Sequence, residues 1–156
     1  MNMVIFERLD GRKKSKIRLL SLITELDLTY IPPISSRIEL SEYCIKLIKF
    51  AEVIVAKQAE IDIGFAAVYA NDKRQRYAFL TSIGVKSEYR KQGIGHLLMK
   101  ETIKIAKEKG MQCFRLEVNN HNHKALMFYK KFGFITYYPT DRLLGDSLFL
   151  EKIIAE

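Results

Sequence analysis

The sequence predicts a single domain of the α/β class (α+β type), with a mixed central sheet of about seven strands and helices on both faces. The chain has 156 residues, which is enough for one domain with a real core and too few for two of ordinary size. Short apolar segments typical of strands alternate with longer segments of helical periodicity. We therefore treat residues 1–156 as one domain.

The N-terminal part of the chain is predicted to hold a strand followed by two helices. Residues 3–9 are typical of a strand that ends at the turn signal Asp10-Gly11, and residues 13–29 have helical periodicity. Four cations open this helix and oppose its dipole: Lys13, Lys14, Lys16 and Arg18. Two adjacent prolines, Pro32 and Pro33, end the helix, and Ser41 is predicted to cap the next one. Either a solvated face or a nearby anion would explain the cations.

The rest of the chain is predicted to alternate between strands and helices. Six further strands are expected at residues 52–56, 63–69, 77–85, 113–118, 133–138 and 147–153. Polar connections at 57–62 and 71–76 suggest two hairpins, and the last two strands are joined across Asp141 to Asp146. Helices are expected at residues 94–109 and about 123–131. The first of these should be a right-handed crossover between two parallel neighbouring strands.

The turn before helix 94–109 is a candidate anion-binding site. A helix start offers unpaired N–H groups and a positive dipole end, and Gly93 and Gly95 leave the backbone open. No P-loop sequence is present, and Leu98 replaces the third glycine of a dinucleotide fingerprint. Glu117 stands where a ribose-binding acid is expected, which leaves the dinucleotide interpretation weakened but open. The glycines could also serve only a tight turn.

The pattern Arg90-x-x-Gly93-x-Gly95 resembles the acyl-CoA pyrophosphate loop of the GNAT superfamily of N-acetyltransferases, Gln/Arg-x-x-Gly-x-Gly/Ala. A second block is also similar to that family: Leu116-Glu-Val118, Asn122, Ala125, Tyr129 and Lys131-Phe-Gly-Phe134. The two blocks follow in the family's order, and the resemblance is clearest over about residues 53 to 135. It implies the GNAT fold, in which strands 77–85 and 113–118 splay apart to admit the acyl-pantetheine arm.

The resemblance also implies a set of site residues. The backbone of Ile83, Gly84 and Val85 would pair with the pantetheine amides, and the loop from Arg90 to Gly95, with the N–H of His96, would hold the pyrophosphate. The cofactor-binding residues implied are Ile83, Gly84, Val85, Arg90, Lys91, Gln92, Gly93, Ile94, Gly95, His96, Asn122, Ala125 and Tyr129. Lys124 could add charge.

Tyr129 is implied as the catalytic acid that protonates the leaving thiolate. A phenol with a reference pKa of about 10 suits a thiolate of roughly similar basicity. The plainer alternatives are that Tyr129 is a core aromatic residue and that Asn122 only caps its helix. The general base stays open, because strand 77–85 offers only Thr81 and Ser82 where many GNAT enzymes place a carboxylate. The remaining candidates are Glu117, His121, His123 or a water chain.

We therefore expect an acetyl-CoA-dependent N-acetyltransferase that moves the acetyl group directly to the primary amine of a small molecule. In GNAT proteins, the first helix and the segment after it lie beside the acceptor groove. The cations at residues 13–18 thus favour an anionic amine, such as an amino sugar nucleotide. The alternatives are a non-catalytic CoA-binding sensor or scaffold, and a protein or peptide N-acetyltransferase.

The composition of the chain limits the kinds of partner that we expect the protein to bind. A formal charge of +8 favours anionic ligands or simply solubility, and no helix-turn-helix or aromatic-basic motif supports nucleic-acid binding. No cationic leader or membrane-length apolar run is present, so we expect a cytoplasmic protein without a membrane partner. Cys44 and Cys113 lack metal-ligand spacing and are expected to be reduced thiols, with no metal bound. A homodimer is left open.

Overall fold

The computed structural model describes residues 3–139 and 145–155. These form four α-helices: α1 (Lys13–Leu26), α2 (Leu40–Phe50), α3 (Ile94–Glu108) and α4 (His123–Lys131). Three short 3-10 turns are η1 (Asp27–Thr29), η2 (Ile34–Ser36) and η3 (Ser87–Tyr89). The strands are β1 (Val4–Arg8), β2 (Glu52–Gln58), β3 (Ile61–Tyr69), β4 (Tyr77–Val85), β5 (Cys113–Asn119), β6 (Ile135–Tyr137) and β7 (Ser147–Ile153).

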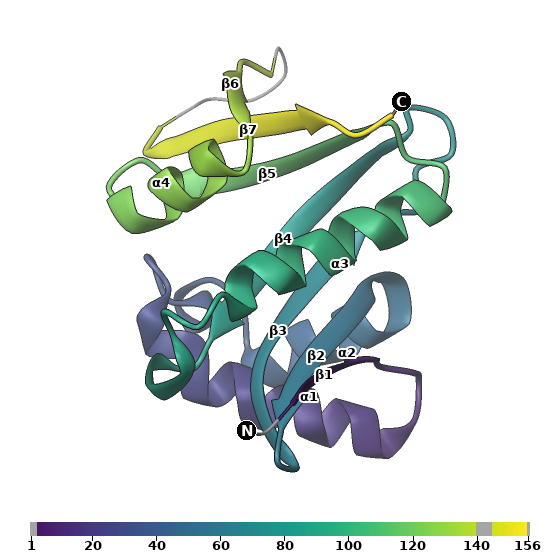
Figure 1. The fold of residues 1–156 in the computed structure, drawn as a ribbon, viewed down its shortest axis with the longest axis vertical. Helices are drawn as coiled ribbons and strands as arrows, with labels where there is room; N and C mark the ends of the chain where they lie inside the picture. The colour runs from purple at the N-terminus through teal and green to yellow at the C-terminus, as the bar shows by residue number, and fades with distance from the viewer. Residues whose placement is uncertain (1–2, 140–144, 156) are drawn as a thin grey trace.

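One mixed sheet of seven strands has the order β1-β2-β3-β4-β5-β7-β6. The pair β4–β5 is parallel, whereas the other five neighbouring pairs are antiparallel. Helix α3 connects β4 to β5, as a parallel pair requires (Figure 1). The predicted mixed sheet is confirmed.

Helices cover both faces of this sheet, as predicted. Strand β2 shows how one strand serves two cores, because its successive side chains point to opposite faces. Val53 and Val55 pack with α1 and α2, whereas Ile54 and Ala56 pack in the core that contains α3 and α4. Within the described ranges, no helix is long and apolar enough to cross a membrane.

Strands β4 and β5 pair over only part of their length. Their register runs from Tyr77 opposite Cys113 to Leu80 opposite Leu116, and then ends. Beyond this point β4 still pairs with β3 as far as Val85, and β5 still pairs with β7 as far as Asn119. The two strands therefore diverge, which confirms the predicted splay (Figure 1).

A β-bulge lies where the divergence begins. The β3–β4 register steps from Ala67 opposite Ser82 to Val68 opposite Leu80, so Thr81 has no partner in β3. A bulge bends its strand and strengthens the local twist. It therefore helps to turn β4 away from β5.

The first predicted helix was too long. Residues 13–26 are α-helical, but 27–29 form η1. The carboxylate of Asp27 accepts hydrogen bonds from the N–H of Ser35, at 2.9 Å, and from the Ser35 hydroxyl. These bonds bring the proline-containing segment back against the end of α1 and stop the helix from continuing.

Three other boundaries also differ from the prediction. Glu39, not Ser41, caps α2, and its carboxylate accepts from the Ser41 N–H at 3.1 Å. The predicted connection at 57–62 is a two-residue turn, in which Ala59 and Glu60 both have positive φ, as a tight hairpin of this kind requires. Strand β6 is shorter than 133–138. Residues 140–144 of the predicted 141–146 connection lie outside the described residues.

Candidate functional site

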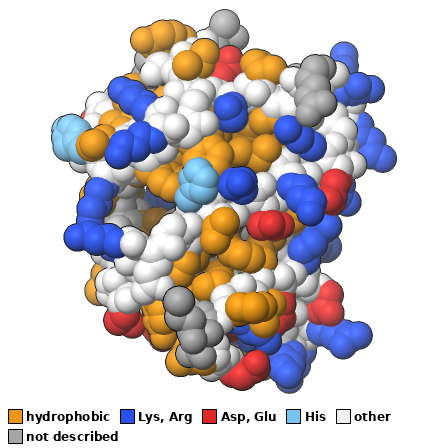
Figure 2. Space-filling model, viewed as in Figure 1, with side chains coloured by type: hydrophobic (Ala, Val, Ile, Leu, Met, Phe, Trp, Pro, Cys, Tyr) orange, Lys and Arg blue, Asp and Glu red, His pale blue; other side chains and the backbone are white. Residues whose placement is uncertain are grey.

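A pocket of about 170 Å³ lies where β4 and β5 diverge. Its walls come from the segment after α1, from both separated strands, from α4 and from the start of β7. They comprise Tyr30, Ile31, Pro32, Ile34, Arg37, Leu80, Thr81, Ser82, Ile83, Glu117, Val118, Asn119, Asn122, Ala125, Tyr129 and Ser147. Figure 2 shows a hollow at the left of the displayed face, bordered by Lys and Arg side chains.

The backbone of the predicted anion site is open in the structure. Gly93 adopts φ +77°, a left-handed conformation that favours glycine, and α3 begins at Ile94. No side chain caps this helix, and the N–H groups of Gly95 and His96 have no acceptor among the residues described. Because the first N–H groups of a helix lack internal partners, these two are available to an anion.

Gly95 is not required by the packing of the protein itself. A Cβ built at this position would meet only Phe128, at 3.7 Å, and Val85, at 4.0 Å, which are ordinary contacts. Its φ is not left-handed. A tight turn therefore explains Gly93 but not Gly95, whose open side faces no neighbour that excludes a methyl group.

Positive charge borders this loop. Arg90 Nε donates to the carbonyl oxygen of Val85 at 3.0 Å, which ties the loop to the end of β4. Its terminal nitrogens have no ion-pair partner in residues 3–139 or 145–155. Lys91 and Gln92 are exposed, and the ring of His96 lies against Phe132 with centroids 4.7 Å apart.

Strand β4 presents an unpaired edge to the pocket. Ile83, Gly84 and Val85 pair with β3 on one side, but they have no partner in β5 on the other. This edge is where the pantetheine amides were predicted to pair.

Helix α4 brings its predicted residues to the same pocket. Asn122 caps the helix, since its Oδ1 accepts from the Ala125 N–H at 3.2 Å, and it also lines the pocket with Ala125 and Tyr129. The Tyr129 ring packs edge-on against Phe128 and Phe134. Its hydroxyl has no hydrogen-bond partner in the described part of the chain. Burial raises the pKa of Tyr129 well above its ordinary value, so the phenol keeps its proton.

Residues 20–134 match the sequence profile described as the acetyltransferase (GNAT) family. The chain belongs to this family. The match covers both of the sequence blocks described above, and the fold around them agrees with it.

Individual relatives of this GNAT chain differ in how much of it they match. A spermidine N(1)-acetyltransferase of Thermoplasma acidophilum is 33% identical over 113 residues, covering 67% of this chain and 68% of the relative. A thialysine N-epsilon-acetyltransferase of Sus scrofa is 45% identical over 58 residues, covering 37% of this chain but only 34% of the relative. The solved PaiA N-acetyltransferase of Thermoplasma acidophilum, in complex with coenzyme A, superposes with a TM-score of 0.75 and 21% identity. That superposition covers 97% of this chain and 99% of the other.

The candidate general bases of this GNAT protein differ in whether they line the pocket. Glu117 lines the pocket, whereas His121 and His123 are exposed and do not. Thr81 and Ser82 also line it. Glu117 and water therefore remain as candidates.

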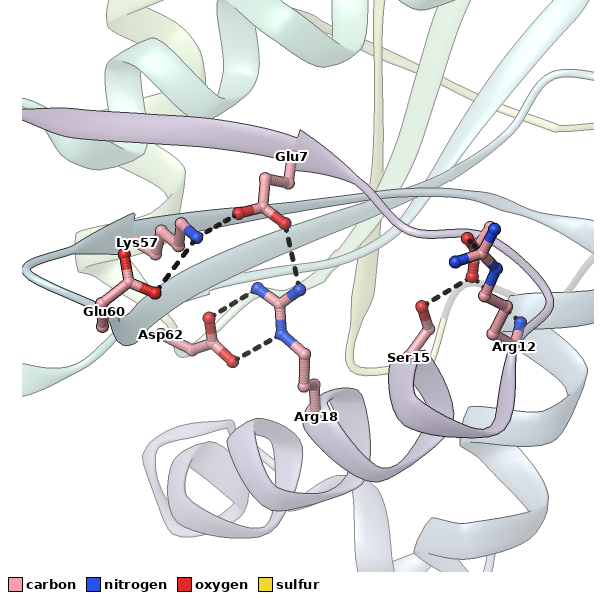
Figure 3. Close-up of polar contacts among 8 residues, drawn as sticks. Glu7, Arg12, Ser15, Arg18, Lys57, Glu60 and Asp62 are labelled. Atoms are coloured by element: carbon pink, nitrogen blue, oxygen red, sulfur yellow. Dashed lines mark hydrogen bonds and ion pairs between the residues drawn. The ribbon is translucent and has the colours of Figure 1, made fainter.

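The cations of the first helix do not lie at the pocket. Arg18 pairs with Asp62 at 2.8 Å and with Glu7 at 3.0 Å, so it points to the sheet (Figure 3). None of Lys13, Lys14, Lys16 and Arg18 is among the pocket-lining residues. They occupy the first turns of α1, and a 14-residue helix places its two ends about 20 Å apart. A carboxylate near this helix start, that of Asp10, accepts hydrogen bonds from the N–H of Arg12 and the hydroxyl of Ser15.

Several pocket residues were not singled out in the sequence, among them Tyr30, Arg37, Asn119 and Ser147. Tyr30 directly precedes Ile31-Pro32-Pro33, in the segment after the first helix that was expected beside the acceptor groove. The position of Tyr30 beside this segment could have identified it as a pocket residue, because an aromatic or basic residue there is able to contact a ligand. Ser147 carried no such signal.

Proposed function

We propose that this GNAT protein is an acetyl-CoA-dependent N-acetyltransferase that moves the acetyl group directly to the primary amine of a small molecule. The observation that carries the proposal is the pocket between the separated strands, which is lined by Tyr129 from α4 and by Ile83 from the unpaired edge of β4. Family membership and the open start of α3 support a coenzyme A donor. The proposed donor site comprises residues 83–85, 90–96, 122, 125 and 129.

Coenzyme A would bind to groups of the protein that have no hydrogen-bond or ion-pair partner among the described residues. The N–H groups of Gly95 and His96 and the terminal nitrogens of Arg90 would hold the pyrophosphate by charge-assisted hydrogen bonds. The edge of β4 would pair with the pantetheine amides in the manner of a missing strand. The thioester would then lie in the pocket.

The chemistry requires one bond to form and one to break. The amine nitrogen attacks the carbonyl carbon, the carbon–sulfur bond breaks, and Tyr129 donates its proton to the departing sulfur. The attacking nitrogen releases one proton. The protons balance because Tyr129, which has given its proton to sulfur, takes up one proton in return. Glu117 lines the pocket and can accept that proton directly or through a water molecule.

For the acceptor, we propose an anionic amine. Arg37 lines the pocket and has no ion-pair partner in the described ranges, so it is the cation placed to hold an anionic group. Among the described residues that line the pocket, Glu117 is the one carboxylate, and a polyamine with several positive charges would find few partners there. The relatives' names include both thialysine and spermidine, and so do not select one acceptor.

A panel of amines with acetyl-CoA, read by release of free thiol, tests this proposal. We expect a higher kcat/KM for an amino sugar nucleotide than for spermidine or an N-terminal peptide, with added salt narrowing the gap. Arg37→Gln should raise KM for the anionic acceptor about tenfold, the lower end for a hydrogen bond to a charged group. Neutralising Lys13, Lys14 and Lys16 together is the matched control and should leave this preference unchanged.

Each other outcome selects an alternative. The best turnover with a peptide would identify a peptide N-acetyltransferase, and spermidine as the best acceptor at low salt would remove the anionic class. Tight binding of coenzyme A without thiol release from any amine would indicate a sensor or scaffold.

Direct transfer further predicts that neither cysteine carries the acetyl group. Burial raises the pKa of Cys44 to about 11, and burial together with the neighbouring Glu151 carboxylate raises the pKa of Cys113. Neither thiol lines the pocket, so neither resembles an activated nucleophile. Cys44→Ala and Cys113→Ala should keep most of the kcat of the wild type. An acetyl adduct on Cys113 after incubation with acetyl-CoA alone, if it then passed to an amine, would contradict direct transfer.

A further inference from the structure

Two tyrosines, Tyr30 in the segment after α1 and Tyr43 on α2, place their hydroxyls against the bulged part of β4. Ser82 Oγ donates a hydrogen bond to Tyr30 Oη at 3.2 Å, and Tyr43 Oη lies 2.9 Å from Thr81 Oγ1. Tyr30 lines the pocket, whereas Tyr43 does not. The two residues therefore have similar bonds to β4 but different access to a ligand.

Gly84 makes room for the Tyr30 hydroxyl. A Cβ at position 84 would lie 2.5 Å from Tyr30 Oη and 3.2 Å from Leu26 Cδ1, so a larger residue would displace the phenol. The φ of Gly84 is not left-handed, so the backbone alone does not call for glycine. A glycine inside a strand often marks a close approach of this kind.

The backbone around Tyr30 is also fixed by hydrogen bonds to Asp27. The Asp27 carboxylate accepts two hydrogen bonds from Ser35, one from its N–H and one from its hydroxyl. The N–H of Tyr30 itself donates to the carbonyl oxygen of Asp27 at 3.2 Å. The position of the phenol is therefore set before a ligand arrives.

The Tyr30 hydroxyl has a proton to donate. Its oxygen accepts the Ser82 proton, and its own proton has no acceptor in the part of the chain that the structure describes. Burial raises the pKa of Tyr30, so the phenol stays protonated. A hydroxyl that accepts one hydrogen bond becomes a stronger donor of the next.

We propose that Tyr30, oriented by Ser82 and admitted by Gly84, donates a hydrogen bond to the acetyl carbonyl oxygen as the amine attacks. This inference rests on the proposed acetyl transfer. The nitrogen–carbon bond forms while the carbonyl π electrons move onto the oxygen, and no proton passes from Tyr30. When the carbonyl re-forms, the carbon–sulfur bond breaks and Tyr129 protonates the sulfur. Tyr30 thus stabilises the negative charge on the carbonyl oxygen, and Tyr129 neutralises the charge on the sulfur.

Tyr30→Phe tests the assignment. Removing one donor to a developing oxyanion typically costs about 10²–10³ in kcat. We expect a loss in this range with an unchanged Kd for acetyl-CoA and an unchanged KM for the acceptor. Gly84→Ala should lower kcat in the wild type by displacing the phenol, but should have a much smaller effect in a Tyr30→Phe background.

Tyr43→Phe is the matched control. It removes a comparable part-buried hydrogen bond from a tyrosine that does not line the pocket, so it should lower Tm about as much as Tyr30→Phe while kcat stays within about threefold of the wild type. The inference fails if folded Tyr30→Phe keeps kcat, if only the acceptor KM rises, or if Tyr43→Phe loses as much activity. A wild type that releases no thiol with any amine overturns the proposed acetyl transfer, and this inference with it.

Discussion

Gly95→Val is expected to abolish measurable coenzyme A binding while the fold survives. A Cβ at this position would make only ordinary contacts, so we expect the fold to accept the substitution, whereas an anion at the start of α3 would meet the added methyl groups. Losing two hydrogen bonds to a charged group, at about 1.5–3 kcal/mol each, weakens binding about 10²-fold or more. Calorimetry with coenzyme A measures the loss, and circular dichroism and Tm verify the fold.

Two further glycine variants make this result interpretable. Gly11→Val is the matched control, since Gly11 is exposed, has no neighbour within 4 Å of an added Cβ, and lies outside the loop. It should bind coenzyme A normally. Gly93→Val should also lose binding, but its φ of +77° adds backbone strain of about 1–3 kcal/mol, so it should also lower Tm. Tight binding by a well-folded Gly95→Val protein would refute the assignment of the loop.

Tyr129→Phe is expected to slow the chemical step without loosening coenzyme A. General acid contributions are typically about 10²–10⁴-fold, so kcat should fall by a factor in this range, while the Kd for acetyl-CoA stays unchanged. The substitution preserves the ring contacts with Phe128 and Phe134. Because the described residues offer the hydroxyl no partner, Tm should also stay near that of the wild type.

Single-turnover measurements should be used for this variant, since they report the chemical step even where product release limits kcat. Tyr69→Phe, a half-buried tyrosine on β3 that does not line the pocket, is the control and should keep its activity. An unchanged single-turnover rate in Tyr129→Phe would make Tyr129 a core aromatic residue. Because burial raises the pKa of Tyr129, the wild type should also show no loss of this acid at pH values near the ordinary phenol pKa of about 10.

Local sequence patterns predicted the features that depend on neighbouring residues. The turn with Gly93 and Gly95 and the helix after it formed where glycine positions and helical periodicity placed them. Asn122, Ala125 and Tyr129 share one side of α4 because their spacing matches the helical repeat, and all three line the pocket. The resemblance of these two blocks to GNAT proteins then supplied the splay, which no single segment encodes.

Predictions that required two distant segments to meet were less successful. The basic start of α1 was expected beside the acceptor, but it lies at the other end of the helix, where Arg18 pairs with Asp62 and Glu7. The C-terminal end of α1, and not its basic start, leads to Tyr30 at the pocket. Periodicity gives the length and apolar face of a helix, but not which of its ends approaches a given strand.

The sequence by itself thus determined the order of strands and helices, the open backbone at the start of α3 and the face of α4 that carries Tyr129. Each of these depends on residues within a few turns of one another. Only the tertiary structure decided that Tyr30 meets Ser82, 52 residues away, above a glycine that leaves it room. Such a contact arises when the whole sheet twists and α1 packs on it, because side-chain positions are then set by close packing of the core and not by local backbone preference.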